Sequence, residues 1–311
     1  MNSEYWLTPE GIKRAQAILN ALTRDDDAAS FGSNDTKAPL DLRGLSFQGH
    51  QGYAPDNTIA TRQGLALKNI DFTNASIPGL QLNGALVINC TFKRARLKGL
   101  ECWGTIFRNC SFEGADMRGS QLSLPLEGAY STYEATDFSR ANLVGANCAD
   151  ASFREVNFFR TKLNGINFRG SDFTDCSFAG TIKNVTFSTE SLTGKQPRAS
   201  AMQGIDFSEA TLRDIEFRHI DTQGITFPVG DPHVTVDHYH CTLTRAIEAL
   251  PVKGKPFTYG LRAYLATELG HAHPERTLGI WHRASLGKTT AEQEFAINIL
   301  KRAESECASK K

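Results

Sequence analysis

The sequence of 311 residues lacks a long apolar segment and an excess of charge of either sign. No apolar run approaches about eighteen residues, and the mean hydropathy is −0.33, so no membrane span is predicted. The N-terminus lacks a charged start followed by an apolar stretch, so we expect no secretory signal and a cytoplasmic location. Lys plus Arg equals Asp plus Glu, at 34 each. Without a basic excess, direct binding of nucleic acid is not expected.

The ligand spacings that prearrange a reactive or metal site are also missing, because neither CxxC nor HExxH occurs. Five of the seven cysteines occupy apolar positions of the repeat described below, where a thiol acts as a compact apolar filler, so we expect no disulfides. Cys241 and Cys307 lie outside the repeat, so apolar packing in the repeat does not account for them. Cys307 lies among acidic neighbours, which disfavour a thiolate nucleophile.

A bulky apolar residue recurs every five positions between about residues 42 and 227. Examples are Ile70-Asp71-Phe72, Ala95-Arg96-Leu97 and Cys110-Ser111-Phe112. A helix would spread positions five apart around its whole surface, and a straight strand cannot keep an odd repeat in phase. Each unit must therefore turn a corner. Glycine suits such corners and follows many centres, at Gly79, Gly84, Gly99, Gly104, Gly114, Gly119, Gly145, Gly165, Gly170, Gly180, Gly204 and Gly224.

Units such as Ala141-Asn142-Leu143-Val144-Gly145 resemble the A(D/N)LxX consensus of the pentapeptide-repeat family. The resemblance covers about three fifths of the chain. It implies an all-β solenoid, a right-handed quadrilateral β-helix with twenty residues per coil. We expect about nine coils and a rod on the order of 45 Å long. Twenty residues per coil would stack Phe72, Phe92 and Phe112 in one interior column, and Phe138, Phe158 and Phe178 in another.

Three segments are expected: an N-terminal helix and linker over residues 1–39, the β-helix over 40–230, and an α-helical capping or interaction region over 231–311. Loops should leave the coil near 50–63, 123–132 and 188–200, where the repeat weakens.

The helices are predicted from caps and apolar periodicity. Thr8 and Pro9 should open a helix that ends near Leu22 and buries Ile12. C-terminal helices are predicted over 242–250, 259–269 and 290–305. The last should open with a capping box at Thr289 and turn Phe295 inward. In the family, such helices sometimes pair two subunits, so the resemblance allows a homodimer.

Two C-terminal motifs suggest chemistry. His238 and His240 would share one face of a strand and could bind a metal, although an ordinary polar junction is the favoured interpretation. Gly287-Lys288-Thr289 resembles the end of a phosphate-binding loop, but His282 stands where its first glycine should be. Some bacterial effectors join a similar solenoid to a ubiquitin ligase that uses a cysteine, yet 231–311 looks too short for that domain. We expect no enzyme, no catalytic residue, no cofactor and no metal.

The distribution of charged residues indicates which kinds of partner the solenoid could bind. Some relatives protect DNA gyrase with an acidic surface that imitates DNA, but residues 40–230 carry nineteen acidic and nineteen basic residues, which weakens this alternative. A basic patch with a net charge of +3 could meet an acidic partner, although a solvated face is the simpler interpretation. Its cations are Lys93, Arg94, Arg96, Lys98, Arg108 and Arg118, set against Glu101, Glu113 and Asp116.

The sequence therefore predicts a rigid, non-enzymatic scaffold that binds a protein partner through its outer faces and loops. Exposed aromatic and arginine side chains are common interface anchors. The candidates in the loops are Tyr53, Asp56 and Arg62, then Tyr130 and Tyr133, then Lys195 and Arg198. Topoisomerase protection and a metal-dependent or effector role of 231–311 are the alternatives.

Overall fold

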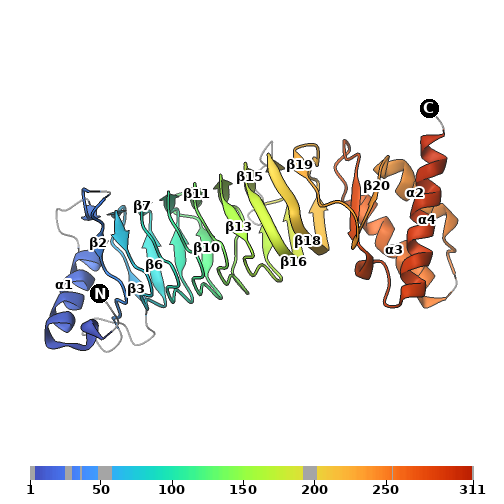
Figure 1. Cartoon of the computed structure of the whole chain (residues 1–311). Coiled ribbons are helices and arrows are strands. Elements are labelled where there is room, and N and C mark those ends of the chain that lie inside the picture. The colour runs from blue at the N-terminus through green and yellow to red at the C-terminus, as the bar shows by residue number, and fades with distance from the viewer. Residues whose placement is uncertain are drawn as a thin grey trace.

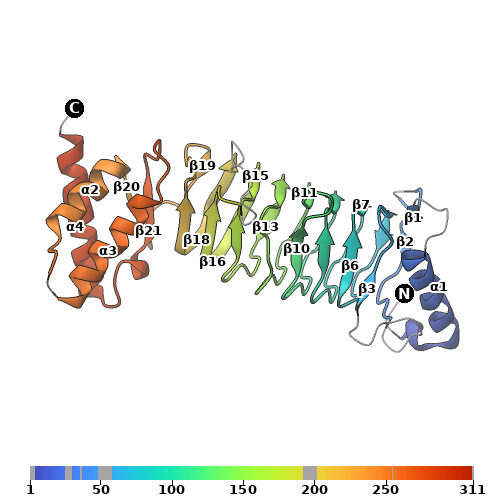
Figure 2. The ribbon, with the colours of Figure 1, turned by 180° about the vertical axis from the view of Figure 1, so that it is seen from behind.

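The chain forms an elongated rod of parallel strands with a helical unit at each end, in a computed structural model (Figure 1). The structure describes residues 4–24, 30–35, 37–47, 58–191, 202–253 and 255–309. Helix α1 (Pro9–Thr23) lies at one end, and α2 (Tyr239–Ala249), α3 (Pro256–Gly270) and α4 (Thr290–Ala308) lie at the other, as the view from behind also shows (Figure 2). None of the helices in the described ranges is long and apolar enough to cross a bilayer.

Parallel sheets follow the sides of the rod. One contains, in spatial order, β1 (Ser30–Gly32), β4 (Ala66–Lys68), β7 (Leu86–Ile88), β9 (Ile106–Arg108), β11 (Thr132–Glu134), β12 (Ser152–Arg154), β15 (Asp172–Thr174) and β17 (Met202–Gln203). Another contains β3 (Ile59–Ala60), β6 (Leu80–Asn83), β8 (Glu101–Trp103) and β10 (Gln121–Leu124). A third contains β13 (Asn157–Phe159), β16 (Ser177–Ser188), β18 (Ile205–Arg218) and β19 (Ile225–Thr226), with β14 (Asn167–Arg169) beside β16. The strands β2 (Leu40–Asp41) and β5 (Ile70–Asp71) form a pair.

Aromatic rings stack in columns along the inside of the rod. The centroids of Phe72, Phe92 and Phe112 are 4.9 Å apart and their planes are nearly parallel, which confirms the first predicted column. Phe138, Phe158 and Phe178 also stack as predicted, at 5.5 and 4.6 Å. The expectation that they form a separate column was wrong, because Phe112 stacks on Phe138 at 5.1 Å and the two series form one stack. The reason is the second loop: the chain leaves the coil after β10 ends at Leu124 and resumes at Thr132 on the next side of the same coil, so that coil lengthens without changing the order of its sides.

Left-handed backbone turns the corners. Gly99 and Gly145 have φ values of 72° and 73°, as corner glycines should. All the predicted corner glycines have positive φ except Gly224. Asparagine, aspartate, glutamate and arginine serve at other corners, among them Asn89 with φ 52° and Arg160 with φ 53°. The glycine pattern of the sequence therefore predicted only some of the corner positions.

Helix α1 covers the first described coil. The Thr8 side chain accepts a hydrogen bond from the Gly11 N–H at 3.1 Å, which confirms the predicted N-cap. The indole N–H of Trp6 donates to the Arg43 carbonyl at 2.7 Å and ties this unit to the solenoid. The prediction that Ile12 is buried was wrong, since 47% of it is exposed while Ala15, Ile18, Leu19 and Leu22 face the core.

The C-terminal unit closes the opposite end. The antiparallel pair β20 (His233–Val236) and β21 (Gly279–His282) lies beside β18. The Leu212 N–H donates to Nε2 of His233 at 2.9 Å, and the His219 N–H donates to the His271 carbonyl at 2.8 Å. Since an open solenoid end exposes unpaired backbone groups, these bonds satisfy part of that edge.

Arg276 lies buried at the junction between the solenoid and the C-terminal unit and is only 4% exposed. Its guanidinium lies 4.1 Å from the Tyr239 ring centroid and donates to the carbonyls of Leu278 at 3.0 Å and Phe217 at 3.4 Å. No pattern in the sequence marked this residue.

The three C-terminal helices lie where the sequence placed them, and the capping box of Thr289 and Glu292 at the start of α4 is present. Phe295 was wrongly expected to face inward, because it is 40% exposed and α4 buries Ala296, Leu300, Ala303 and Cys307 instead.

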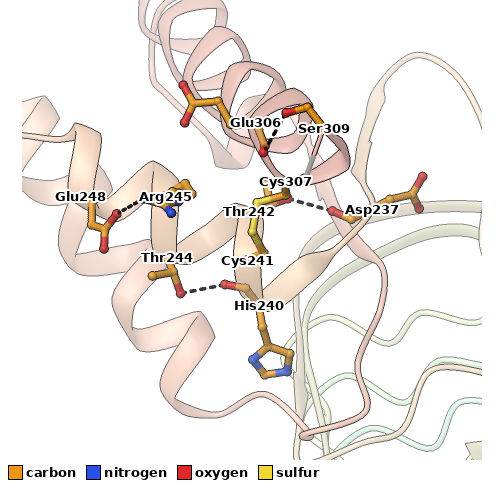
Figure 3. Close-up of a disulfide and its surroundings, with 10 residues drawn as sticks. All are labelled: Asp237, His240, Cys241, Thr242, Thr244, Arg245, Glu248, Glu306, Cys307 and Ser309. Atoms are coloured by element: carbon orange, nitrogen blue, oxygen red, sulfur yellow. Dashed lines mark hydrogen bonds and ion pairs between the residues drawn. A yellow bond between two sulfur atoms is a disulfide. The ribbon is translucent and has the colours of Figure 1, made fainter. Parts of the chain in front are cut away.

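The prediction that the chain contains no disulfide was wrong. Cys241 on α2 and Cys307 on α4 are bonded, with their Cα atoms 6.0 Å apart (Figure 3). The error arose because 66 residues separate the two positions and only the packing of α2 against α4 brings them together. The cytoplasmic location expected from the sequence loses part of its support, since disulfides persist in oxidising compartments. The other five cysteines are free and buried, as expected.

Candidate interaction surfaces

Outward side chains of the rod form columns, because strands of successive coils pair in register. Glu134 pairs with Arg108 on one side and Arg154 on the other, and Arg96 pairs with Asp116. Charge signs therefore mix along these edges. Neighbouring strands lie about 4.8 Å apart, so the outer side chains occupy fixed, closely spaced positions.

The predicted basic patch is assembled, and its six cations are exposed on neighbouring coils. Carboxylates interleave with them, however. Nζ of Lys93 lies 3.1 Å from Glu113, and the Arg118 guanidinium lies 2.7 Å from Asp116. The hydrogen bond from Arg118 lowers the pKa of Asp116, and that from Lys93 lowers the pKa of Glu113. Both carboxylates therefore stay ionised and offset much of the patch.

The remaining cations of the patch differ in their partners. Arg108 lies 3.1 Å from Glu134, and Arg94 donates to Oδ1 of Asn74 at 3.2 Å. Arg96 and Lys98 have no salt bridge within the described ranges. The patch is thus less available to an acidic partner than its net charge suggested.

The structure describes only three of the seven loop candidates. Tyr53, Asp56, Lys195 and Arg198 lie outside the described residues. The first predicted loop also ends early, because Ile59 is buried in β3.

Arg62 serves the N-terminal helix, since its N–H donates to the Leu22 carbonyl at 3.0 Å and its guanidinium to the Arg24 carbonyl at 3.4 Å. Tyr130 is half-buried. The choice of Tyr133 was wrong: its ring is fully buried in the aromatic stack and its hydroxyl donates to the Leu122 carbonyl at 2.7 Å.

The second loop folds back onto the rod. Leu126 and Ala129 exchange backbone hydrogen bonds of 2.9 Å around a tight turn. The Leu126 side chain lies over Gly84 and Gly104, where an added Cβ would come within 2.9 and 3.0 Å of it. Both glycines therefore provide space for the loop, and the loop presents Glu127 and Gly128 to the exterior.

The C-terminal histidines do not form the strand pair that the metal hypothesis required. His238 precedes α2 with a left-handed backbone, and His240 lies in the first turn, where its Nε2 is 3.0 Å from the His273 carbonyl. Among the described residues, no group of three or more His, Cys, Asp or Glu side chains could hold a metal ion. Burial raises the pKa of the Cys102 and Cys110 thiols to about 12, which disfavours a nucleophilic thiolate at either position.

The clearest outward feature is an aromatic ring between two arginines, which we name the Phe159 corner. It comprises Arg140, Phe159, Arg160 and Lys162. The guanidinium carbons of Arg140 and Arg160 lie 5.9 and 5.0 Å from the Phe159 ring centroid. Glu113 contacts Arg140 at 3.2 Å, whereas Arg160 and Lys162 have no salt bridge within the described part of the chain.

Comparison with known proteins agrees with this geometry. A family model for pentapeptide repeats matches residues 88–123, 134–164 and 151–182 in eight copies. The chain contains pentapeptide repeats. Its parallel sheets form the β-helix solenoid that the resemblance implied. No curated protein sequence matches it.

Several solved structures are similar to this chain. A trypsin-treated variant of QnrB1, a plasmid-mediated fluoroquinolone resistance protein, is 21% identical, with 60% of this chain and 89% of that chain covered and a TM-score of 0.32. HetL from the cyanobacterium Nostoc, involved in regulating heterocyst differentiation, is 16% identical, with 73% and 91% covered and a TM-score of 0.28. A pentapeptide repeat protein from the thylakoid lumen of Arabidopsis thaliana is 26% identical, with 42% and 77% covered and a TM-score of 0.26.

The Phe159 corner was missed by sequence reasoning, although the sequence carries a signal for it. Phe158 is the buried centre of its unit, so Phe159 falls at an outward position that is polar or small in the neighbouring coils, at Ser139 and Ala179. Arg140 and Arg160 are one coil apart. An aromatic residue at an outward position of this repeat is therefore the signal to look for.

Proposed function

We propose that this protein is a non-enzymatic scaffold that binds a protein partner through the outer faces of its rod. The observation that carries the proposal is the fixed lattice of outward side chains. Paired guanidinium and carboxylate groups hold one another in place, as in Arg43 with Asp41 at 2.9 Å and Arg118 with Asp116 at 2.7 Å. A surface whose side chains are already ordered loses less conformational entropy on binding.

The interior supports the same proposal. Large side chains such as Phe92, Phe107 and Phe158 are almost fully buried and fill the rod, so recognition falls to the exterior. The folded second loop and the Phe159 corner are the exterior features that we propose as contact points, with Tyr130 at the edge of the loop.

Capture from the native host, with the purified full chain as bait, tests this function. The variants are a Gly-Ser replacement of residues 125–129 and the exterior substitution Phe159→Ser. We expect at least one variant to lose a partner that the wild type retains, while its melting temperature stays within about 3 °C, because the half-buried Phe159 and the loop of residues 125–129 lie outside the aromatic core. A partner set that is identical for the wild type and every exterior variant would contradict the proposal.

A further inference from the structure

We propose that the Phe159 corner binds an acidic segment of a partner protein. This inference rests on the proposed function and names the surface and the partner chemistry. Arg140 and Arg160 place two cations beside the half-buried Phe159 ring, and the exposed Lys162 follows two residues after Arg160. The carboxylate that contacts this group is Glu113, 3.2 Å from Arg140.

A glycine in the next coil provides the space that the Arg160 side chain of the Phe159 corner needs. The Arg160 side chain crosses the next coil at Gly180, where an added Cβ would lie 3.2 Å from its Cγ atom. Gly180 also has φ 84°, a left-handed conformation that suits glycine. The cation is thus directed along the rod beside the Phe159 ring.

The surroundings differ from those of the predicted basic patch. In the patch, three of the six cations, Lys93, Arg108 and Arg118, each contact a carboxylate within 3.1 Å, and the corner shares with Arg96 and Lys98 the lack of a salt bridge among the described residues. At the corner, Arg160 and Lys162 are exposed and have no such contact among the residues that the structure describes. Asp137 lies on the same side one coil earlier, where its carboxylate accepts hydrogen bonds from the N–H and hydroxyl of Ser139.

The chemistry selects an acidic polypeptide. Carboxylates pair with guanidinium groups in a bidentate manner, and the Phe159 ring offers apolar surface between them, a combination typical of protein interfaces. A nucleic acid would meet only three cations here, on a solenoid whose acidic and basic residues balance, and binding to a phosphate backbone depends on many more.

The test uses the full chain and a fluorescein-labelled decamer of glutamate, with a glutamine decamer and a 20-base-pair DNA duplex as alternative probes. Arg160→Gln and Phe159→Ser are the test variants. Arg154→Gln is the matched control, because Arg154 is an exposed arginine on the neighbouring side and loses the same charge.

We expect Arg160→Gln to weaken glutamate binding about fivefold or more, and Arg154→Gln by less than about twofold, since a desolvated cation contributes about 1 kcal/mol or more. Unchanged melting temperatures show that both variants fold. Equal losses in the two arginine variants, tighter binding of the duplex or of the glutamine decamer, or no glutamate binding by the wild type would overturn the inference. With any of these results, the capture experiment could still identify a partner that binds another face of the rod. The two proposals can therefore be refuted independently.

Discussion

Reducing the Cys241–Cys307 disulfide should destabilise the C-terminal unit and leave the solenoid unchanged. The bond joins α2 to α4 and closes a loop of 66 residues. In the chain-entropy model, a loop of this length stabilises the folded state by about 4 kcal/mol, because the cross-link restricts the unfolded chain. The five cysteines of the rod are free, so reduction removes no bond there.

Calorimetry of the full chain with and without reductant measures the effect. We expect the transition of the C-terminal unit to move to lower temperature on reduction, and Cys241→Ser to reproduce the shift without reductant. Cys307→Ser should give the same result, and reductant should then have no further effect on either variant.

Thiol counting provides the refuting result. Alkylation of the denatured, unreduced protein should label five cysteines, and labelling after reduction should reach all seven. Seven labelled thiols before reduction would show that the bond does not form. A C-terminal transition that is insensitive to reductant would show that the bond forms without contributing to stability.

Three further predictions follow from the core and the junction. Phe112→Ala should lower the free energy of unfolding by about 3–5 kcal/mol in denaturant titration, whereas Phe159→Ala should cost less than about 1 kcal/mol; equal costs would refute the assignment of inner and outer faces. Burial, together with the nearby His282, lowers the pKa of His233 below its ordinary value of 6.5, so the unfolded state binds more protons at this group, and the wild type should lose stability relative to His233→Gln as pH drops below 6.5. A pH-melting profile checks this, and His233→Gln should flatten the decline; an unchanged decline would count against His233. Arg276→Met should destabilise the junction by about 2–4 kcal/mol through the loss of its carbonyl bonds and its contact with Tyr239, and a melting curve like that of the wild type would contradict this role.

The sequence predicted the solenoid well because a period of five restricts the backbone strongly. The column of Phe72, Phe92 and Phe112 followed from the twenty-residue coil alone. The continuation of that column through Phe138 did not, because it depends on where the second loop returns to the rod, and the five-residue pattern does not record that position.

Contacts between distant segments were harder to predict. The bond between Cys241 and Cys307 and the burial of Arg276 both require knowledge of how helices dock, and no local pattern records that. The basic patch was found, but its neutralisation was underestimated because side-chain pairs such as Lys93 with Glu113 form between coils. Tyr133 was predicted to lie on the surface, but it occupies an inward position of the repeat and is buried.

Site-specific photo-crosslinking in the native host tests the central claim most directly. A photoreactive phenylalanine analogue at position 159 samples the rod exterior, and the same analogue at Tyr259, a 58% exposed aromatic residue of α3, samples the C-terminal unit. The account predicts a covalent adduct from position 159 with a protein that has an acidic segment at the crosslink. Adducts from position 259 alone would contradict it.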